Sequence, residues 1–446
     1  MDSMNKGAQN RLRSTDQGKT SRSDSVVVFL VLVTTFFMFG FNNANTSVMP
    51  EYFLHIGGDP LIAGAQNSLC VLVAVGLRFG FGPLADRIGS KPLMAIGAIG
   101  FLIPCAIMPL CASLEEAFGL RFLQAIGLAA FHPNVARYIT AVSAPDTTTK
   151  RISFSRIAST ASLMVIPAFL LPLAQDGNWV GFFIAMSLMA TISLVIILIL
   201  PADRIKASKH GDVPDTGIES QPQGDRKMAP SECRDTVRGN RLDEASDKGH
   251  PKSSFVALAH LTKSPYGRSL LLAMVAPTLA SFGYSIVLAF GPMYMTTVLP
   301  EMNSGLVLSA MSVGGLAGSY AIGKRVFGDN MRTVICLFLF ILCAGLACFS
   351  LSSLGLVVAL ISAVLIGFSY FGVITALVTE VSIKSDMSIS GTMLAMQQNN
   401  LDIGIMLGSL FAGVTLQAGM TMGICLLIVG FIVAIGAICW YILYKT

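Results

Sequence analysis

Arg121 and Asp402 are the outstanding charged residues of this sequence, because they lie inside long apolar runs where no water solvates a charge. A charge at the middle of a membrane helix costs about 2.5–3.5 kcal/mol on insertion scales, and such residues usually face protein or water along a pathway for ions or solutes. Both residues are therefore candidates for chemistry that moves an ion or a solute.

Asp402 shares one helical face with Gln398, one turn earlier, and with Ser409, two turns later. Burial disfavours the charged form of a carboxyl group, so Asp402 could take up and release a proton. The alternative is a structural carboxylate that accepts hydrogen bonds from polar groups of another helix.

Arg121 shares a face with Gln124, and His132 follows three turns along the same run. Arginine stays protonated, so Arg121 cannot carry a proton, but it could bind an anionic solute or tune a nearby acid. The alternative is a structural ion pair with Glu115 and Glu116. His132 could titrate near neutral pH, although a single histidine among apolar neighbours is more often a packing residue.

A further polar group lies at the end of the first apolar run. Asn42, Asn45 and Thr46 share one face at helical spacing. They could hydrogen-bond a solute or join neighbouring helices. The sequence has no nucleotide-binding loop of the form G-x-x-x-x-G-K-[ST] and no metal-ligand spacing, so we expect neither a cofactor nor a metal.

The elements that must position these residues are twelve apolar stretches. The chain has 446 residues, of which 53% are hydrophobic and 12% charged, whereas about a quarter would be charged in a soluble protein. A bilayer core of about 30 Å needs roughly 20 helical residues, and the long continuous runs do not alternate as barrel strands would. We therefore predict an all-α membrane protein with spans at 25–48, 60–80, 92–112, 116–138, 152–174, 178–200, 266–290, 303–323, 333–352, 355–379, 388–415 and 419–443.

The placement of charge predicts the orientation and the domains. Lysines and arginines gather at alternate connections, whereas the opposite connections carry acids such as Glu51 and Glu301. The positive-inside rule then puts both termini in the cytoplasm of a cell-membrane protein, and scattered basic residues argue against a nucleic-acid partner. We predict a disordered tail over 1–24, six-helix bundles over 25–200 and 265–446, and a disordered cytoplasmic linker over 201–264.

Residues 82–91 are the most specific motif. We expect a short cytoplasmic turn, in which Gly82 and Gly89 permit tight backbone geometry. The segment matches the pattern G-x-L-x-D-R-x-G-x-K at Gly82, Leu84, Asp86, Arg87, Gly89 and Lys91. In these residues the chain resembles the major facilitator superfamily of transporters.

The resemblance extends to two other spans. Residues 121–127 are similar to the stretch R-x-x-Q-G-x-G, with Ala125 in place of one glycine, and Asp402 with Gly404 is similar to a D-x-G stretch of efflux-type members. Antiporter members also carry a glycine-rich pattern in span 5, of which only Pro167 remains here. A weak echo of the 82–91 motif at residues 323–332 agrees with two related halves.

The resemblance implies a central cavity between the halves, lined by spans 1, 4, 7 and 10. The cavity candidates are Asn42, Asn45, Thr46, Gln124, His132, Tyr284, Tyr370 and Gln398. It also implies that Asp86 latches the cytoplasmic gate against the start of span 11 and that Arg121 influences proton coupling. Gln66 and Asn67 could face Asp402, because the family places spans 2 and 11 together.

Together these features predict a secondary transporter rather than an enzyme. We expect a monomer that exports a small organic solute in exchange for protons, by alternating access. The alternative is proton-coupled uptake of a small organic metabolite, which the incomplete span-5 pattern leaves open.

Overall fold

In the computed structural model the chain is helical over most of the residues that the structure describes, which are 2–143, 145–202, 275–328, 330–384 and 387–443. Side chains are described in these ranges except at residues 2–24, 145–146, 149 and 380–396. The described part of the chain holds twelve long helices and no strand, so the predicted all-α fold class is confirmed.

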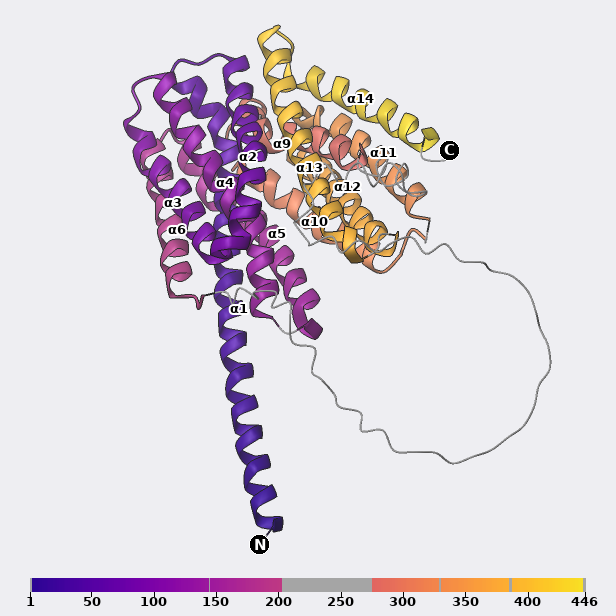
Figure 1. The fold of residues 1–446 in the computed structure, drawn as a ribbon. Helices are drawn as coiled ribbons and strands as arrows, with labels where there is room; N and C mark the ends of the chain where they lie inside the picture. Colours follow the sequence, from indigo (N-terminus) through magenta and orange to yellow (C-terminus); the bar gives the residue numbers. More distant parts are fainter. Residues whose placement is uncertain (1, 144, 203–274, 329, 385–386, 444–446) are drawn as a thin grey trace, which may run out of the picture.

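The helices form two bundles of six, which lie side by side in Figure 1. The N-terminal bundle consists of α1 (Asp2–His55), α2 (Pro60–Ile88), α3 (Ser90–Ile107), α4 (Leu114–Val142), α5 (Pro145–Gln175) and α6 (Trp179–Ile199). The C-terminal bundle consists of α9 (Val275–Val298), α10 (Gly305–Gly323), α11 (Met331–Phe349), α12 (Leu356–Lys384), α13 (Met387–Gln417) and α14 (Met422–Leu443). Short 3-10 turns, η1 (Met108–Leu110) and η2 (Ser352–Leu354), follow α3 and α11.

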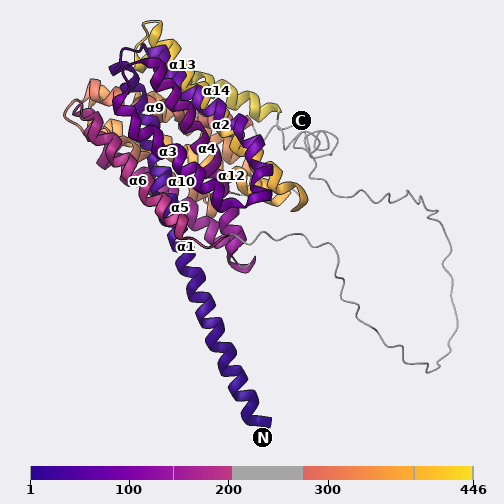
Figure 2. The same cartoon turned by 60° about the vertical axis from the view of Figure 1, so that its left-hand side comes forward.

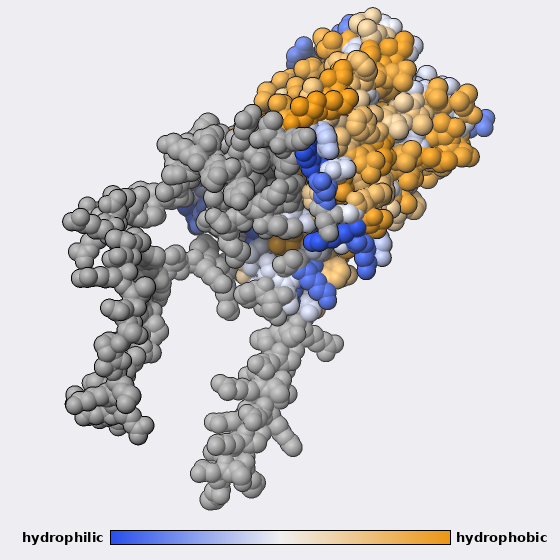
Figure 3. Space-filling model, turned by 90° about the vertical axis from the view of Figure 1, so that its right-hand side faces the viewer, coloured by the Kyte–Doolittle hydropathy of each residue, from blue (hydrophilic) through white to orange (hydrophobic). Residues whose placement is uncertain are grey.

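Eleven of these helices are long and apolar enough to cross a membrane. The twelfth, α4, has 29 residues but contains two glutamates in its first turn and Arg121, Gln124 and His132 further along. On the face that Figure 3 shows, the coloured surface is largely hydrophobic. Phe169, Leu198 and Phe431, for example, are 76%, 62% and 67% exposed. Such a surface is stable only against lipid, so the chain is a multi-pass membrane protein.

Most ends of the predicted spans lie within a few residues of the helix ends. Three ends differ by seven or eight residues: α1 continues to His55 (predicted 48), α5 begins at Pro145 (predicted 152) and α9 continues to Val298 (predicted 290). Two further exceptions bear on the argument. Helix α1 begins at Asp2, where the sequence predicts a disordered tail over 1–24 (Figure 1). No proline precedes Pro50, so nothing in residues 2–24 forbids helix from continuing upstream of the first span. The predicted linker over 201–264 lies almost entirely outside the described residues and stays a prediction.

The second exception is the motif at 82–91, which is not the short turn that we expected. Helix α2 continues through Gly82 and Asp86 to Ile88, and α3 begins at Ser90. The whole connection is therefore Gly89, whose φ of 88° favours glycine. Gly82 is helical, and a Cβ added there would meet nothing within 4 Å, so its backbone freedom is not needed.

The two bundles use a basic residue in the same way at equivalent places. Lys91, at the start of α3, donates to the carbonyl oxygens of Leu198 (3.0 Å) and Leu200 (2.5 Å) at the end of α6. Arg332, at the start of α11, donates to the Tyr441 carbonyl at the end of α14 and covers that residue's ring. Each cation satisfies the free carbonyls and the negative dipole end of the last helix in its bundle. This correspondence supports the sequence echo between the halves.

Three pairs of helices join the bundles: α2 with α13, α5 with α10, and α1 with α9. A series of hydrogen bonds joins α5 to α10 and to the connection before it. At one end of the series Gln175 Nε2 donates to the Met302 carbonyl (2.8 Å), and at the other Ser312 Oγ donates to the Thr160 carbonyl (2.5 Å). On α2, an added Cβ at Gly64 would lie 2.4 Å from the carbonyl oxygen of Ser409 on α13. These contacts gather toward the end formed by the 56–59, 176–178 and 299–304 connections, opposite to the end from which α1 projects (Figures 1 and 2).

Candidate functional site

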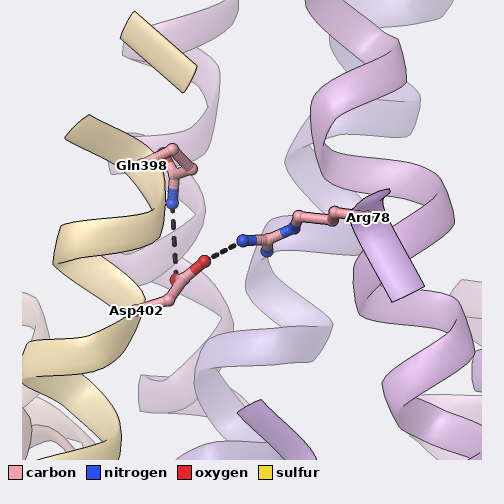
Figure 4. A network of polar contacts seen from close by, with 3 residues as sticks. All are labelled: Arg78, Gln398 and Asp402. Atoms are coloured by element: carbon pink, nitrogen blue, oxygen red, sulfur yellow. Dashed lines mark hydrogen bonds and ion pairs between the residues drawn. The ribbon is translucent and has the colours of Figure 1, made fainter. Parts of the chain in front are cut away.

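A buried ion pair joins the two bundles. Arg78 of α2 donates through Nη1 to the Oδ2 atom of Asp402 on α13, and the two side chains are only 12% and 9% exposed. The other carboxylate oxygen accepts from Gln398 Nε2 at 3.4 Å, one turn earlier on α13. Figure 4 shows Arg78 reaching across from α2 toward the face of α13 that carries both residues. Asp402 is thus held by both bundles.

Close helix contacts fix the position of Asp402. Two residues later, Gly404 lies so near α9 that an added Cβ would be 2.5 Å from the Thr278 carbonyl. Gly408 lies equally close to the Phe282 carbonyl, at 2.4 Å. Gly404 and Gly408 therefore let α13 pack closely against α9, which fixes the position of Asp402 on that face of the helix.

A second buried polar network surrounds Arg121 of α4. Its Nη1 donates to Gln124 Oε1 (2.5 Å) and its Nη2 to Asn67 Oδ1 on α2 (3.2 Å). Asn45 of α1 also donates to Gln124 Oε1, at 3.0 Å. Asn67 Nδ2 donates onward to Ser409 Oγ of α13, at 2.8 Å, so this network also crosses between the bundles.

The alternative considered for Arg121, a structural ion pair with Glu115 and Glu116, is not formed. Glu116 accepts instead from the Ala112 backbone at 2.8 Å, next to the Ser113 cap that starts α4. Arg121 lies two turns further into the helix, and both of its hydrogen-bond partners are neutral amides.

Helix α4 is placed by its contact with α3. A Cβ added at Gly100 of α3 would lie 2.8 Å from the backbone nitrogen of Gly127, and one added at Gly127 would meet the Phe101 ring at 2.9 Å. Gly127 closes the R-x-x-Q-x-x-G stretch of α4. Its missing side chain lets α4 approach α3, which holds Arg121 and Gln124 toward α1 and α2.

His132 and Arg78 lie near each other below this network. The His132 ring contacts Phe39 edge-on, with 4.2 Å between ring centroids, and Arg78 is close enough to influence its charge. Neither ring nitrogen of His132 makes a hydrogen bond of good geometry with the described residues, although the Leu128 carbonyl is a weak polar neighbour. The ring of His132 therefore packs against Phe39, and its two nitrogens lack a strong hydrogen-bond partner among the described residues.

The two tyrosines predicted on spans 7 and 10 meet. The rings of Tyr284 (α9) and Tyr370 (α12) stack at a centroid distance of 3.7 Å and an interplanar angle of 9°. Tyr370 lies near both Ser281 and Asp402. Tyr370 therefore lies on the same side as Asp402, and Tyr284 packs against its ring.

Some of the remaining candidates hydrogen-bond within the two networks, and others do not. On α1, Asn45 joins the Arg121 network, while Thr46 is buried and Asn42 is half-buried. Gln66 donates to the Ala63 carbonyl on its own helix, at 3.0 Å, and does not reach Asp402. Asn67 reaches α13 at Ser409 rather than at Asp402.

In the 82–91 motif, the partner that the structure shows for Asp86 is Arg137 of α4, an exposed ion pair within one bundle. Arg137 also donates to the Gly82 carbonyl at 3.1 Å. The expected latch partner at the start of α13 falls among the undescribed side chains, so the latch stays a prediction. Leu84 is half-buried and Arg87 exposed.

Sequence reasoning missed Arg78, the partner of Asp402. Arg78 stands inside an apolar run just as Arg121 does, and the same rule would have found it. Among the described residues no group of three or more His, Cys, Asp or Glu side chains could hold a metal ion.

Comparison with known proteins gives both a family and relatives. The model of the Major Facilitator Superfamily matches residues 30–409. The multidrug transporter MdfA of Shigella boydii serotype 4 (strain Sb227) is 28% identical over an alignment of 170 positions, which covers 33% of this chain and 40% of MdfA. The chloramphenicol resistance protein CraA of Acinetobacter baumannii is 23% identical over 201 residues, 43% of this chain and 48% of CraA. The matches thus span less than half the length of these relatives.

A solved structure supports the fold over nearly the whole chain. The crystal structure of the nucleoside transporter NupG superimposes with a TM-score of 0.68 and 13% identity, covering 94% of this chain and 99% of that one. The family match over residues 30–409 confirms the resemblance that the 82–91 motif indicated.

Proposed function

Because the chain belongs to the Major Facilitator Superfamily, we propose that it moves a small organic solute across the membrane by alternating access, exporting the solute in exchange for protons. The observation that carries this proposal is the buried Arg78–Asp402 ion pair between α2 and α13. A titratable carboxylate that bridges two mobile halves can connect proton binding to their movement.

The coupling step follows from charge. With the proton absent, Asp402 is a carboxylate and attracts Arg78 strongly in a low-dielectric interior. When a proton binds, Asp402 becomes neutral and the attraction falls to that of a hydrogen bond, which frees α2 to move relative to α13. Re-forming the pair in the arrangement described here expels the proton again.

The direction of opening rests on the contacts between the bundles. They gather at the end of the 176–178 and 299–304 connections, which closes that end. If the positive-inside rule applies, both termini are cytoplasmic and the closed end faces outward. The structure is then the state that opens toward the cytoplasm, where an exporter collects its solute and releases its proton.

The likeness to MdfA and CraA supports export. One observation favours uptake as the second candidate. Span 5 lacks the glycines of antiporter members, and α5 carries Ser162, Ile166, Leu170 and Leu171 at those positions around Pro167. The experiment must therefore distinguish the two directions.

Purified protein in liposomes tests both directions for a solute of any identity. The vesicles are incubated in a small-molecule cell extract to which chloramphenicol is added, and a pH gradient is imposed in either direction. Mass spectrometry then identifies what accumulates. An antiporter concentrates its solute in an acidic lumen, whereas a symporter concentrates it in an alkaline one.

The Asp402→Asn variant tests the coupling residue in the same vesicles. It should abolish gradient-driven accumulation but leave exchange at equal pH, because the neutral amide mimics the protonated form of Asp402. Glu301→Gln, the same chemical change at an exposed connection, is the control and should behave as the wild type. Accumulation that survives unchanged in Asp402→Asn would make Asp402 structural.

A further inference from the structure

Within the described part of the chain, Arg121 is a buried cation with no buried anion beside it. The residue is only 3% exposed, and its guanidinium has five N–H donors in a fixed fork. Two of these donors have acceptors, which are the amide oxygens of Gln124 and Asn67. Its Nε is buried and has no hydrogen-bond partner among the described residues. The hydrogen-bonding need of Arg121 is thus partly met, and its charge has no counter-ion among the side chains that the structure describes.

Asp402 does not supply the missing charge. Its carboxylate is bound to Arg78. Along α13 it lies seven residues from Ser409, the point at which the Arg121 network touches that helix, which is about 10 Å at 1.5 Å per residue. Two buried arginines therefore share one carboxylate among the described spans of α2, α4 and α13, which leaves one net positive charge.

We propose that Arg121 is the recognition site for the carboxylate group of the transported solute. A single unmatched positive charge fits a monovalent anion, whereas a phosphate with about −1.5 to −2 charges would exceed it. The planar guanidinium accepts a carboxylate in a bidentate arrangement, which neutral amides cannot match in strength. The solute class is then a small organic carboxylate, and this identification rests on the proposed transport function.

The neighbours of Arg121 give this site a connection to the movement of the bundles. Asn67 accepts from Arg121 through Oδ1 and donates to Ser409 of the other bundle through Nδ2. A carboxylate that replaces Asn67 as the acceptor leaves that amide free to turn, and so loosens a hydrogen bond that joins α2 to α13. Solute binding and proton binding would then act on the same helix junction.

The first test does not depend on the solute or on transport. Asn67→Asp places a carboxylate against Arg121 at nearly constant shape, and it should raise the thermal unfolding temperature in phosphatidylcholine nanodiscs, which carry no net lipid charge. Gln66→Glu is the matched control, because Gln66 is also fully buried on α2 but turns to the Ala63 carbonyl. It should lower that temperature. The proposal would be overturned if both variants lowered the unfolding temperature.

The second test uses acetate as the bare carboxylate, with acetamide as its neutral analogue and sodium chloride at matched ionic strength. Acetate should stabilise the wild type saturably beyond chloride and acetamide. The extra stabilisation should disappear in Asn67→Asp, where the site already holds an anion. An equal response of the two proteins would contradict the assignment. If these results hold while no solute follows a pH gradient, the transport proposal fails and the anion site stands.

Discussion

Arg78 and Asp402 stabilise the protein only as a pair. Each is a full charge in an interior that water barely reaches, and removal of one partner from a buried pair typically costs about 3–5 kcal/mol because the other is left bare. The same pair replaced by two neutral groups costs far less. The stability of the junction therefore depends on charge balance more than on either side chain alone.

A double-mutant cycle tests this balance. Arg78→Gln and Asp402→Asn should each lower the free energy of unfolding by about 3–5 kcal/mol, and the double variant by less than either single variant. Reversible unfolding in mixed micelles would measure the free energy of unfolding of the wild type, the two single variants and the double variant. Additive losses in the double variant would mean that the two side chains do not interact in the membrane.

At this scale the sequence revealed the charges and not their partners. Asp402 and Arg121 could be found because a charge inside an apolar run is unusual, and Arg78 was open to the same reasoning. That Asp402 meets Arg78, 324 positions away in the sequence, follows only from the way α2 and α13 cross. The neutral surroundings of Arg121 likewise depend on which face α4 turns toward α2.

At the scale of helices, α2 contains two glycines in opposite situations. A Cβ at Gly64 would lie 2.4 Å from the Ser409 carbonyl of α13, whereas one at Gly76 would meet nothing within 4 Å. Gly64 is therefore required by the close approach of two helices. Gly76 only weakens the helix, by about 1 kcal/mol relative to alanine.

The matched variants Gly64→Ala and Gly76→Ala should move the protein in opposite directions. Gly64→Ala should lower the unfolding temperature and reduce transport, because α2 and α13 are pushed apart beside the Asn67–Ser409 hydrogen bond. Gly76→Ala should leave transport intact and stabilise the protein by up to about 1 kcal/mol. Thermal unfolding and the liposome assay would report both. Equal effects of the two changes would show that the junction is not tightly packed.

Helix positions were the most predictable feature, because continuous apolar runs mark them. The end of α2 was the clearest error, since Gly82 and Gly89 suggested a short turn between them. The helix instead passes through Gly82 and through Pro83, although the proline removes one backbone donor and crowds the preceding turn. Arg137 donates to the Gly82 carbonyl at this place, which adds a hydrogen bond to the irregular turn.

At the scale of the whole molecule, we expect the two bundles to move as two bodies. The hydrogen bonds of Lys91 and of Arg332 to the last helix of each bundle, called the clamps below, support this expectation. Each clamp ties the third helix of a bundle to its sixth, so a bundle can tilt as a unit while contacts between the bundles change. The sequence predicted two related halves from their lengths and from the echo at 323–332. It could not predict which end is closed, because both states share one sequence.

The most direct test of this two-body account is a pair of distances measured in the same protein. One pair of nitroxide amino acids would be inserted genetically at Asp176 and Glu301, on the closed end. A second pair would be inserted at Ile88, the last residue of α2, and at Val326, just after α10, both on the opposite end. Pulsed electron resonance would record each distance at neutral and acidic pH. The account predicts that the first distance lengthens as the second shortens. Distances that stay fixed under all conditions, or that change in the same sense, would contradict it.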